Sequence, residues 1–185
     1  FLEFGVKEGR STKKFLELCE KNNGNLISVD VDDYKNLSSS PKWKFIHTRD
    51  DNFEEVEKHI HNQLDLIYLD SLHEANHVKK ILFHYYKYLK VGGYFFIDDI
   101  SWLPYLKNQT RDNFYCEINN KETFDKLVEI YLCNKNKFDI SFSFISSGIC
   151  RIKKLNENLI EPDKIETRET SFKNIIRRIV GKLKN

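Results

Sequence analysis

The sequence lacks any uninterrupted apolar run close to the roughly 20 residues that a membrane-spanning helix needs. It also has little excess charge, because 30 Lys and Arg residues stand against 28 Asp and Glu residues. The resulting net charge of +2 gives no support to a protein whose main task is to bind nucleic acid, so no nucleic-acid partner is expected. With 185 residues, 40% of them hydrophobic, the chain has the length and apolar content of one globular domain.

Cysteine is scarce and scattered. The four cysteines form no C-x-x-C pair and stand at no zinc-ligand spacing from a histidine. They indicate free thiols in a reducing compartment, and since the first residues do not resemble a signal peptide, the cytoplasm is the expected location. Methionine is absent altogether and the sequence begins within a predicted strand, so we expect an N-terminal segment to be missing.

Short, nearly continuous apolar segments alternate with segments of helical periodicity. Strands are predicted at residues 1–4, 26–30, 44–47, 64–70, 94–99, 138–145 and 148–154. Helices are predicted at residues 12–22, 53–62, 74–89 and 121–134. Strands that alternate with helices predict an α/β, doubly wound, Rossmann-like sheet that is mostly parallel and binds its ligand at the carboxyl ends of the strands. The last two strands are joined through Ser146, Ser147 and Gly148, which predicts a C-terminal antiparallel hairpin.

The composition divides the chain into a domain at residues 1–154 and a C-terminal region at residues 155–185, where a polar linker precedes a basic amphipathic helix. The apolar face of this helix consists of Phe172, Ile175, Ile176, Ile179, Val180 and Leu183. The basic residues are Lys173, Arg177, Arg178, Lys182 and Lys184. Such a helix packs on its own domain or on a partner subunit of a homo-oligomer, or it lies on an anionic membrane surface, here through residues 171–185.

Two glycines, Gly5 and Gly9, lie between the first predicted strand and the following helix. A P-loop would be one residue longer and would have a lysine in place of Arg10, and the dinucleotide pattern G-x-G-x-x-G is also absent. Glu3 favours a ligand with a positive charge, such as S-adenosylmethionine, whose ammonium it would hold. The carboxylate of that ligand would lie at the helix N-terminus and the Ser11 hydroxyl. The alternative is an ordinary strand-to-helix turn with Ser11 as the N-cap.

Acidic residues also follow the next two strands. Asp30 ends the second predicted strand, about 20 residues after Gly9, which is where an acid binds the ribose hydroxyls of a nucleoside. Asp50 or Asp51, at the end of the third, would contact the adenine amino group. The alternative is that one of them caps the helix predicted to begin at Phe53.

These segments resemble the class I S-adenosylmethionine-dependent methyltransferases, and more narrowly their metal-dependent O-methyltransferase branch. The form L-E-x-G-x-x-x-G-x-S at residues 2–11 resembles the glycine loop of catechol O-methyltransferase. The resemblance implies that Glu3, Gly5, Gly9 and Ser11 hold the methionine moiety of the cofactor. Because LISVD resembles the family's second strand, it also implies that Asp30 binds the ribose. The motifs cover about residues 1–100.

Three further acids follow two adjacent predicted strands: Asp70 ends the fourth, and Asp98 and Asp99 end the fifth. Like charges about 4 Å apart repel by about 4 kcal/mol per pair at an effective dielectric constant near 20, so such a trio favours a bound cation. Oxygen ligands suit a hard ion such as Mg²⁺. The alternative is that one acid caps a helix and the others are solvated.

The same three positions resemble the family's metal ligands, although catechol O-methyltransferase has Asp-Asn where this chain has Asp98-Asp99. The Asp-Asp pair and the segment from Asp70 to His73 are more similar to the macrocin and mycinamicin sugar O-methyltransferases and to the cephalosporin hydroxylase group. In the sugar enzymes the histidine three residues after the metal acid is taken to be the base. The resemblance therefore implies Asp70 and His73 as catalytic residues.

The sequence thus predicts a Mg²⁺-dependent O-methyltransferase that transfers a methyl group from S-adenosylmethionine to a hydroxyl of a sugar or of a glycosylated small molecule. One alternative is an Fe(II) enzyme of the cephalosporin hydroxylase type on the same fold. Another is a non-catalytic module that binds a nucleotide or associates with a membrane through its terminal helix.

Overall fold

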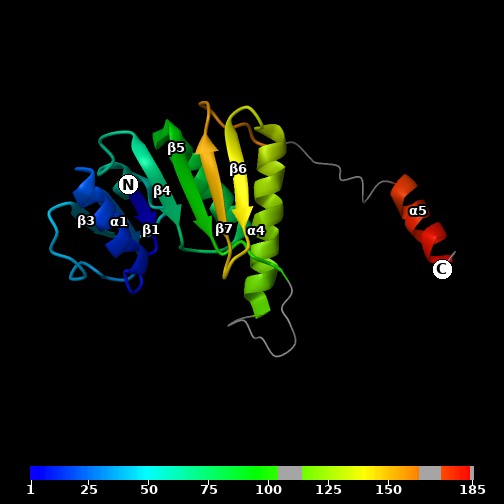
Figure 1. Ribbon diagram of the computed structural model, residues 1–185, viewed down its shortest axis with the longest axis horizontal. Coiled ribbons are helices and arrows are strands. Elements are labelled where there is room, and N and C mark those ends of the chain that lie inside the picture. The colour runs from blue at the N-terminus through cyan, green and yellow to red at the C-terminus, as the bar shows by residue number, and fades with distance from the viewer. Residues whose placement is uncertain (104–113, 163–171, 184–185) are drawn as a thin grey trace.

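A mixed seven-stranded sheet forms the centre of the molecule (Figure 1). The computed structural model describes residues 1–103, 114–162 and 172–183, without the side chains of residues 114–117, 178 and 181–183. The strands are β1 (Leu2–Phe4), β2 (Leu26–Asp30), β3 (Trp43–His47), β4 (Leu64–Leu69), β5 (Leu89–Asp98), β6 (Phe138–Ser143) and β7 (Ile149–Lys154). Their order is β3-β2-β1-β4-β5-β7-β6.

The first five strands are parallel, and β7 runs antiparallel to both β5 and β6. This arrangement confirms the predicted mostly parallel sheet with a C-terminal antiparallel hairpin. Strand β1 pairs with β2 on one side and with β4 on the other, so the strand order reverses at β1. In open α/β sheets, the crevice at the carboxyl ends of the strands beside such a reversal is the usual ligand site.

The helices are α1 (Arg10–Lys21), α2 (Phe53–Glu57), α3 (Ala75–Tyr85), the 3₁₀ helix η1 (Tyr86–Tyr88), α4 (Phe114–Cys133) and α5 (Phe172–Leu183). Helix α2 is shorter than predicted, because the amide of Ile60 donates to Glu57 in an i to i−3 turn that ends the helix. Strand β5 begins five residues earlier than predicted. It passes through Gly92, at a φ of 87°, next to a register irregularity against β4. Among the described residues, no helix is long and apolar enough to cross a bilayer.

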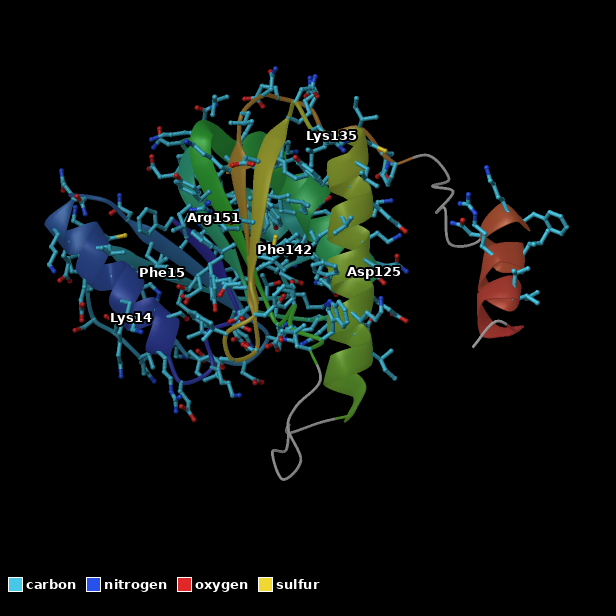
Figure 2. The ribbon with its side chains drawn as sticks, turned by 45° about the vertical axis from the view of Figure 1, so that its right-hand side comes forward. Lys14, Phe15, Asp125, Lys135, Phe142 and Arg151 are labelled. Carbon is cyan, nitrogen blue, oxygen red and sulfur yellow. The ribbon has the colours of Figure 1, made fainter. Side chains whose placement is uncertain are left out.

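Two clusters of buried residues pack the helices against the sheet. The larger one joins the inner face of the sheet to α2, α3 and α4, with Phe4, Ile67, Phe95 and Leu127 among its members. In Figure 2, Phe142 of β6 lies between the sheet and α4, where its ring is 4.7 Å from that of Phe124. The smaller cluster packs α1 on β2 through Leu16, Cys19 and Leu26. The helices thereby cover both faces of the sheet and leave the carboxyl ends of its strands free for a site.

Candidate active site

The glycine loop after β1 is shaped by close contacts that only glycine permits. Gly5 has a φ of 91°, and a Cβ atom there would lie 1.9 Å from the carbonyl oxygen of Asp70. Gly9, with a φ of 70°, stands directly before α1, and a Cβ atom there would lie 2.3 Å from a methyl carbon of Leu37. The first contact ties the loop to the end of β4. The loop and the predicted metal acid Asp70 are therefore parts of one site.

Glu3 lies beneath this loop with no exposed surface. Its carboxylate accepts hydrogen bonds from the hydroxyls of Ser11 at 2.6 Å, Thr12 at 2.8 Å and Ser28 at 2.6 Å. Burial raises the pKa of Glu3, and the three hydroxyl donors oppose that effect. In this arrangement Glu3 acts on the loop through hydroxyl groups, so its direct contact with a ligand ammonium stays a prediction. The structure also shows that Ser11 is the second residue of α1, not its N-cap.

Asp30, at the end of β2, supports the loop from the other side. One carboxylate oxygen accepts the amides of Val6 at 2.6 Å and Lys7 at 3.3 Å, and the second accepts the amide of Asp32 at 3.0 Å. The side chain remains partly exposed beside the loop. This is the position that ribose binding requires, and the role itself stays a prediction.

The predicted acid cluster contains a histidine. Among the described residues, Asp70, His73 and Asp99 offer ligand atoms that all lie within 4.8 Å of one another. His73 Nε2 is 3.1 Å from Asp99 Oδ2 and 3.6 Å from Asp70 Oδ1. Burial, together with the charges of Asp98 and Asp99, raises the pKa of Asp70 to about 7. The site therefore concentrates more negative charge than its own donors neutralise, which is the environment that favours a cation.

Asp98 lies beside this group but is engaged differently. One carboxylate oxygen accepts a 2.6 Å hydrogen bond from the Tyr68 hydroxyl, while the other accepts the Asp99 amide at 2.8 Å and the Ser147 hydroxyl at 3.1 Å. Asp70 and Asp99 thus converge with a histidine, and Asp98 lies behind them, so its role as a metal ligand stays a prediction. Asp99 departs from the strand direction because its backbone is left-handed, with a φ of 56°.

The turn between β6 and β7 supports the segment that follows β5. The Ser101 amide donates to the Ser147 carbonyl at 2.7 Å. Gly148, at a φ of 83°, approaches so closely that an added Cβ atom would lie 2.6 Å from the Ser101 nitrogen. The antiparallel hairpin therefore also fixes the backbone beside Asp99.

Asp50 and Asp51, the predicted adenine contacts, are both engaged with protein groups. Asp50 is 8% exposed and accepts the Ser71 hydroxyl at 2.5 Å, and the same oxygen lies 2.7 Å from His77 Nε2. Asp51 pairs with Arg49 at 2.9 Å and with Lys80 at 3.1 Å. These partners, led by the hydrogen bond from Arg49, lower the pKa of Asp51 to about 2. Neither aspartate caps α2 through its side chain, and contact of either with adenine stays a prediction.

Two adjoining hollows connect the loop with the acid cluster. One of about 200 Å³ is lined by Val6, Lys7, Glu8, Arg10, Ser11 and Asp70. The other, of about 320 Å³, is lined by Arg10, Ser11, Lys14, Phe15, Tyr68 and Asp70. A larger hollow of about 640 Å³ lies at the opposite edge of the sheet, at the amino ends of β2, β3 and β4. The two smaller hollows are the better candidates for the site, because ligands of such sheets bind at the carboxyl ends.

The profile of one protein family, described as a methyltransferase domain, matches residues 2–100, which is more than half of the chain. The chain belongs to this methyltransferase domain family. This finding confirms the predicted resemblance to the methyltransferases and supports S-adenosylmethionine as the cofactor. The matched segment includes the glycine loop and every predicted site residue.

Solved structures share the fold of this methyltransferase domain. A Staphylococcus aureus protein provisionally described as a caffeoyl-CoA O-methyltransferase has 18% identity and a TM-score of 0.63, over 83% of this chain and 74% of its own. The SAH-bound Podospora anserina methyltransferase PaMTH1 has 18% identity and a TM-score of 0.61, over 83% of this chain and 70% of its own.

MycE, a methyltransferase from the mycinamycin biosynthetic pathway solved with Mg and SAH, shares 15% identity with a TM-score of 0.61. The match covers 83% of this chain but 44% of MycE, so the methyltransferase domain spans less than half the length of that protein. At these identities the likeness establishes the fold alone. No curated protein matches the sequence.

Several residues of the site carry no motif and were missed by sequence reasoning. Tyr68 and Ser147 hold Asp98, Ser28 holds Glu3, and His77 is buried against Asp50. For Tyr68 a signal exists, because residues two apart on a strand face the same side and Tyr68 precedes Asp70 by two. For the others the partners come from distant segments, and the sequence offers no sign of the pairing.

Proposed function

We propose that this domain is an O-methyltransferase that moves the methyl group of S-adenosylmethionine to a hydroxyl of a sugar or of a glycosylated small molecule, with the aid of a divalent cation such as Mg²⁺. The observation that carries the proposal is the contact between Gly5 and Asp70. It joins the loop expected to hold the methyl donor directly to the end of β4, where the candidate cation ligands gather. A donor and an acceptor bound at these two places would be neighbours.

The residues at the cluster fit a cation. Asp70 and Asp99 provide carboxylate oxygens, and the pKa of Asp70, raised to about 7, reflects burial and repulsion from neighbouring acids that a cation would relieve. Asp70 and Asp99 would hold the ion, and Asp98 lies behind them and accepts the Asp99 amide. When bound, a divalent cation supplies positive charge that makes a nearby hydroxyl more acidic.

His73 is the candidate base. Its Nε2 atom lies at the cluster, 3.1 Å from Asp99 Oδ2, so Asp99 can orient the ring. Histidine side chains exchange protons near neutral pH, which suits them to remove a proton from an acidified hydroxyl. The acceptor hydroxyl would lose its proton to the free ring nitrogen of His73 while its oxygen bonds to the methyl carbon of the donor. The bond from that carbon to sulfur breaks, which leaves a neutral thioether.

The protein's main contribution to such a reaction is positioning, because the methyl donor is already activated by its sulfonium charge. Asp30 and the hydroxyls held by Glu3 fix the loop, and the contact of Gly5 with β4 fixes the distance between the two halves of the site. Support for a sugar acceptor comes from the Asp-Asp pair and the segment from Asp70 to His73, which resemble the sugar O-methyltransferases. MycE adds an example of this fold solved with Mg and with mycinamycin VI.

The test begins with isothermal titration of S-adenosylmethionine into the protein, with Mg²⁺ and then with chelator. We expect binding in the micromolar range, followed by Mg²⁺-dependent methylation in a screen of sugar acceptors. Asp70→Asn is expected to abolish the metal-dependent transfer. Asp139→Asn, which removes an exposed carboxylate on β6, should leave it unchanged. Full activity in chelator or in Asp70→Asn would overturn the metal-assisted mechanism.

A second candidate is an Fe(II) hydroxylase of the cephalosporin hydroxylase type. The observation in its favour is the imidazole at the cluster, because nitrogen ligands suit transition metals better than Mg²⁺. In this case His73 would be a metal ligand. Product formation that requires Fe(II) and oxygen, with no transfer of a labelled methyl group, would support hydroxylation. Label transfer with Mg²⁺ in the absence of iron would exclude it.

A further inference from the structure

Helix α5 has an apolar face that no described part of the chain covers. Phe172 is 79% exposed and Ile179 is 55% exposed, while Ile175, Ile176 and Val180 are each more than 40% exposed. These residues recur at intervals of three and four, so they share one side of the helix. In Figure 1, no other described element lies against α5. Neither this domain nor another described segment therefore buries the apolar face.

All the charged residues of α5 are basic. Lys173 and Arg177 are exposed, and the sequence adds Arg178, Lys182 and Lys184, with no acidic residue between Phe172 and the end. These five charges exceed the net charge of +2 of the whole chain, so the rest of the protein is net negative. Helix α5 thus combines an exposed apolar face with a concentration of positive charge.

We propose that α5 binds the surface of an anionic lipid bilayer. The helix would lie in the plane of the interface, with its apolar face among the upper acyl chains and its basic side chains among the phosphate headgroups. The positive charge of α5 favours a lipid surface over a second copy of the chain as its binding partner. Pairing of α5 with the same helix of a second copy would bring two basic helices together, whereas an anionic lipid surface complements the charge of α5. With 12 residues the helix is about 18 Å long, which suits an interfacial position and is too short to span the bilayer.

The experiment is co-sedimentation of the full chain with vesicles of phosphatidylcholine, and with vesicles that also contain phosphatidylglycerol. We expect the partition coefficient on the anionic vesicles to be at least about tenfold higher, and to fall with added salt, because the basic residues act through screened electrostatics. Absence of binding to either vesicle, or equal binding to both, would overturn the proposal.

Two double variants test the apolar face and the basic residues of α5 separately. Ile175→Ser with Ile179→Ser removes apolar contacts while keeping the charge, and serine has a helix propensity similar to that of isoleucine. Lys173→Gln with Arg177→Gln removes charge while keeping the apolar face. Each pair is expected to lower partition into anionic vesicles at least about tenfold. Vesicle binding that neither pair weakens would place the contact elsewhere and overturn the proposal.

A matched control removes two exposed lysines from the sheet domain, Lys13→Gln with Lys21→Gln on α1. This variant should bind vesicles as the wild type does, and a loss equal to that of the α5 charge variant would show that only net charge matters. Light scattering of the lipid-free protein tests the alternative occupant. A dimer that the isoleucine variant dissociates, together with no vesicle binding, would assign the face to a second copy and overturn the proposal.

Discussion

The hydroxyl of Tyr68 donates a 2.6 Å hydrogen bond to the carboxylate of Asp98, and both residues lie at the carboxyl ends of neighbouring parallel strands. The same hydroxyl is 3.4 Å from Asp70 Oδ2. Burial, with the nearby carboxylates, raises the pKa of Tyr68, so the phenol keeps its proton. Tyr68 therefore stands between the two acids as a donor and fixes Asp98 behind the cluster formed by Asp70, His73 and Asp99.

Replacing Tyr68 with phenylalanine removes this donor and leaves the ring in contact with Phe15, whose centroid is 5.4 Å away. Residues that orient metal ligands typically contribute 10-fold to 100-fold to metal affinity, so we expect Mg²⁺ affinity to fall by about tenfold. Isothermal titration of Mg²⁺ in the presence of S-adenosylmethionine measures the change. Tyr94 of β5 lies on the same face of the sheet as Tyr68, and Tyr94→Phe serves as the control. Unchanged affinity in Tyr68→Phe would show that Asp98 needs no such support.

The contact between Gly5 and Asp70 leads to a second prediction. In Gly5→Ala the new Cβ would lie 1.9 Å from a backbone oxygen, so β1 and β4 must separate at the site. We expect the free energy of unfolding to fall by about 2 kcal/mol or more, with loss of S-adenosylmethionine binding. Urea denaturation and calorimetric titration measure the two effects.

Gly92→Ala provides the matched control for that variant. Gly92 also has a positive φ, of 87°, but an added Cβ there has no neighbour within 4 Å. The free energy of unfolding of Gly92→Ala should therefore fall only by the cost of backbone strain, about 1 kcal/mol, and the variant should retain S-adenosylmethionine binding. Equal destabilisation of the two variants would contradict the steric argument.

The positions of the site residues along the sheet follow from the sequence, because parallel strands bring their carboxyl ends together. The apolar run LISVD marks β2 with the observed bounds, and Asp30 follows from it at once. The strand pattern does not predict which of Asp98 and Asp99 joins the cluster with Asp70 and His73. The choice depends on the left-handed backbone at Asp99 and on donors from Tyr68 and Ser147, and the strand pattern contains neither.

The burial of the Glu3 and Asp50 carboxyl groups was equally hard to predict from the sequence. The glycine loop suggested a Glu3 that faces a ligand, yet the structure closes three hydroxyls around it. Two of those hydroxyls come from α1 and the third, Ser28, comes from β2, so the pocket exists only once helix and sheet have packed. The pairing of Asp50 with His77 has the same origin, since 27 residues separate them in sequence.

Glu3→Ala tests the contribution of the three hydrogen bonds that the buried Glu3 carboxylate accepts. The substitution leaves three hydroxyls without their acceptor, and the loss of hydrogen bonds to a charged group is expected to reduce the free energy of unfolding by about 3 kcal/mol. Glu17→Ala, at an exposed position of α1, should change it by less than about 0.5 kcal/mol. Urea denaturation compares the two variants. A stability of Glu3→Ala close to that of the wild type would mean that the hydroxyls find other partners.

The raised pKa of Asp70 makes the stability of the metal-free protein depend on pH. Burial, with Asp98 and Asp99, raises this pKa to about 7 in the folded state, against about 3.9 in an unfolded chain. Folding therefore favours the protonated carboxyl. The stability that this gives is fully present below about pH 4 and is lost as the pH rises through about 7.

Asp70→Asn removes that penalty, because an amide stays neutral at every pH. We expect the variant to be more stable than the wild type at pH 8, with a difference on the order of 1 kcal/mol that disappears towards pH 4, since the side chain is partly exposed and solvent screens its charge. Urea denaturation at both pH values, with chelator present, measures the difference, and Asp139→Asn controls for the loss of one negative charge.

Adding Mg²⁺ at pH 8 should stabilise the wild type and leave Asp70→Asn unchanged, because an ion that binds only the folded state raises the stability of that state. A Mg²⁺ response of equal size in both proteins would show that the ion binds elsewhere.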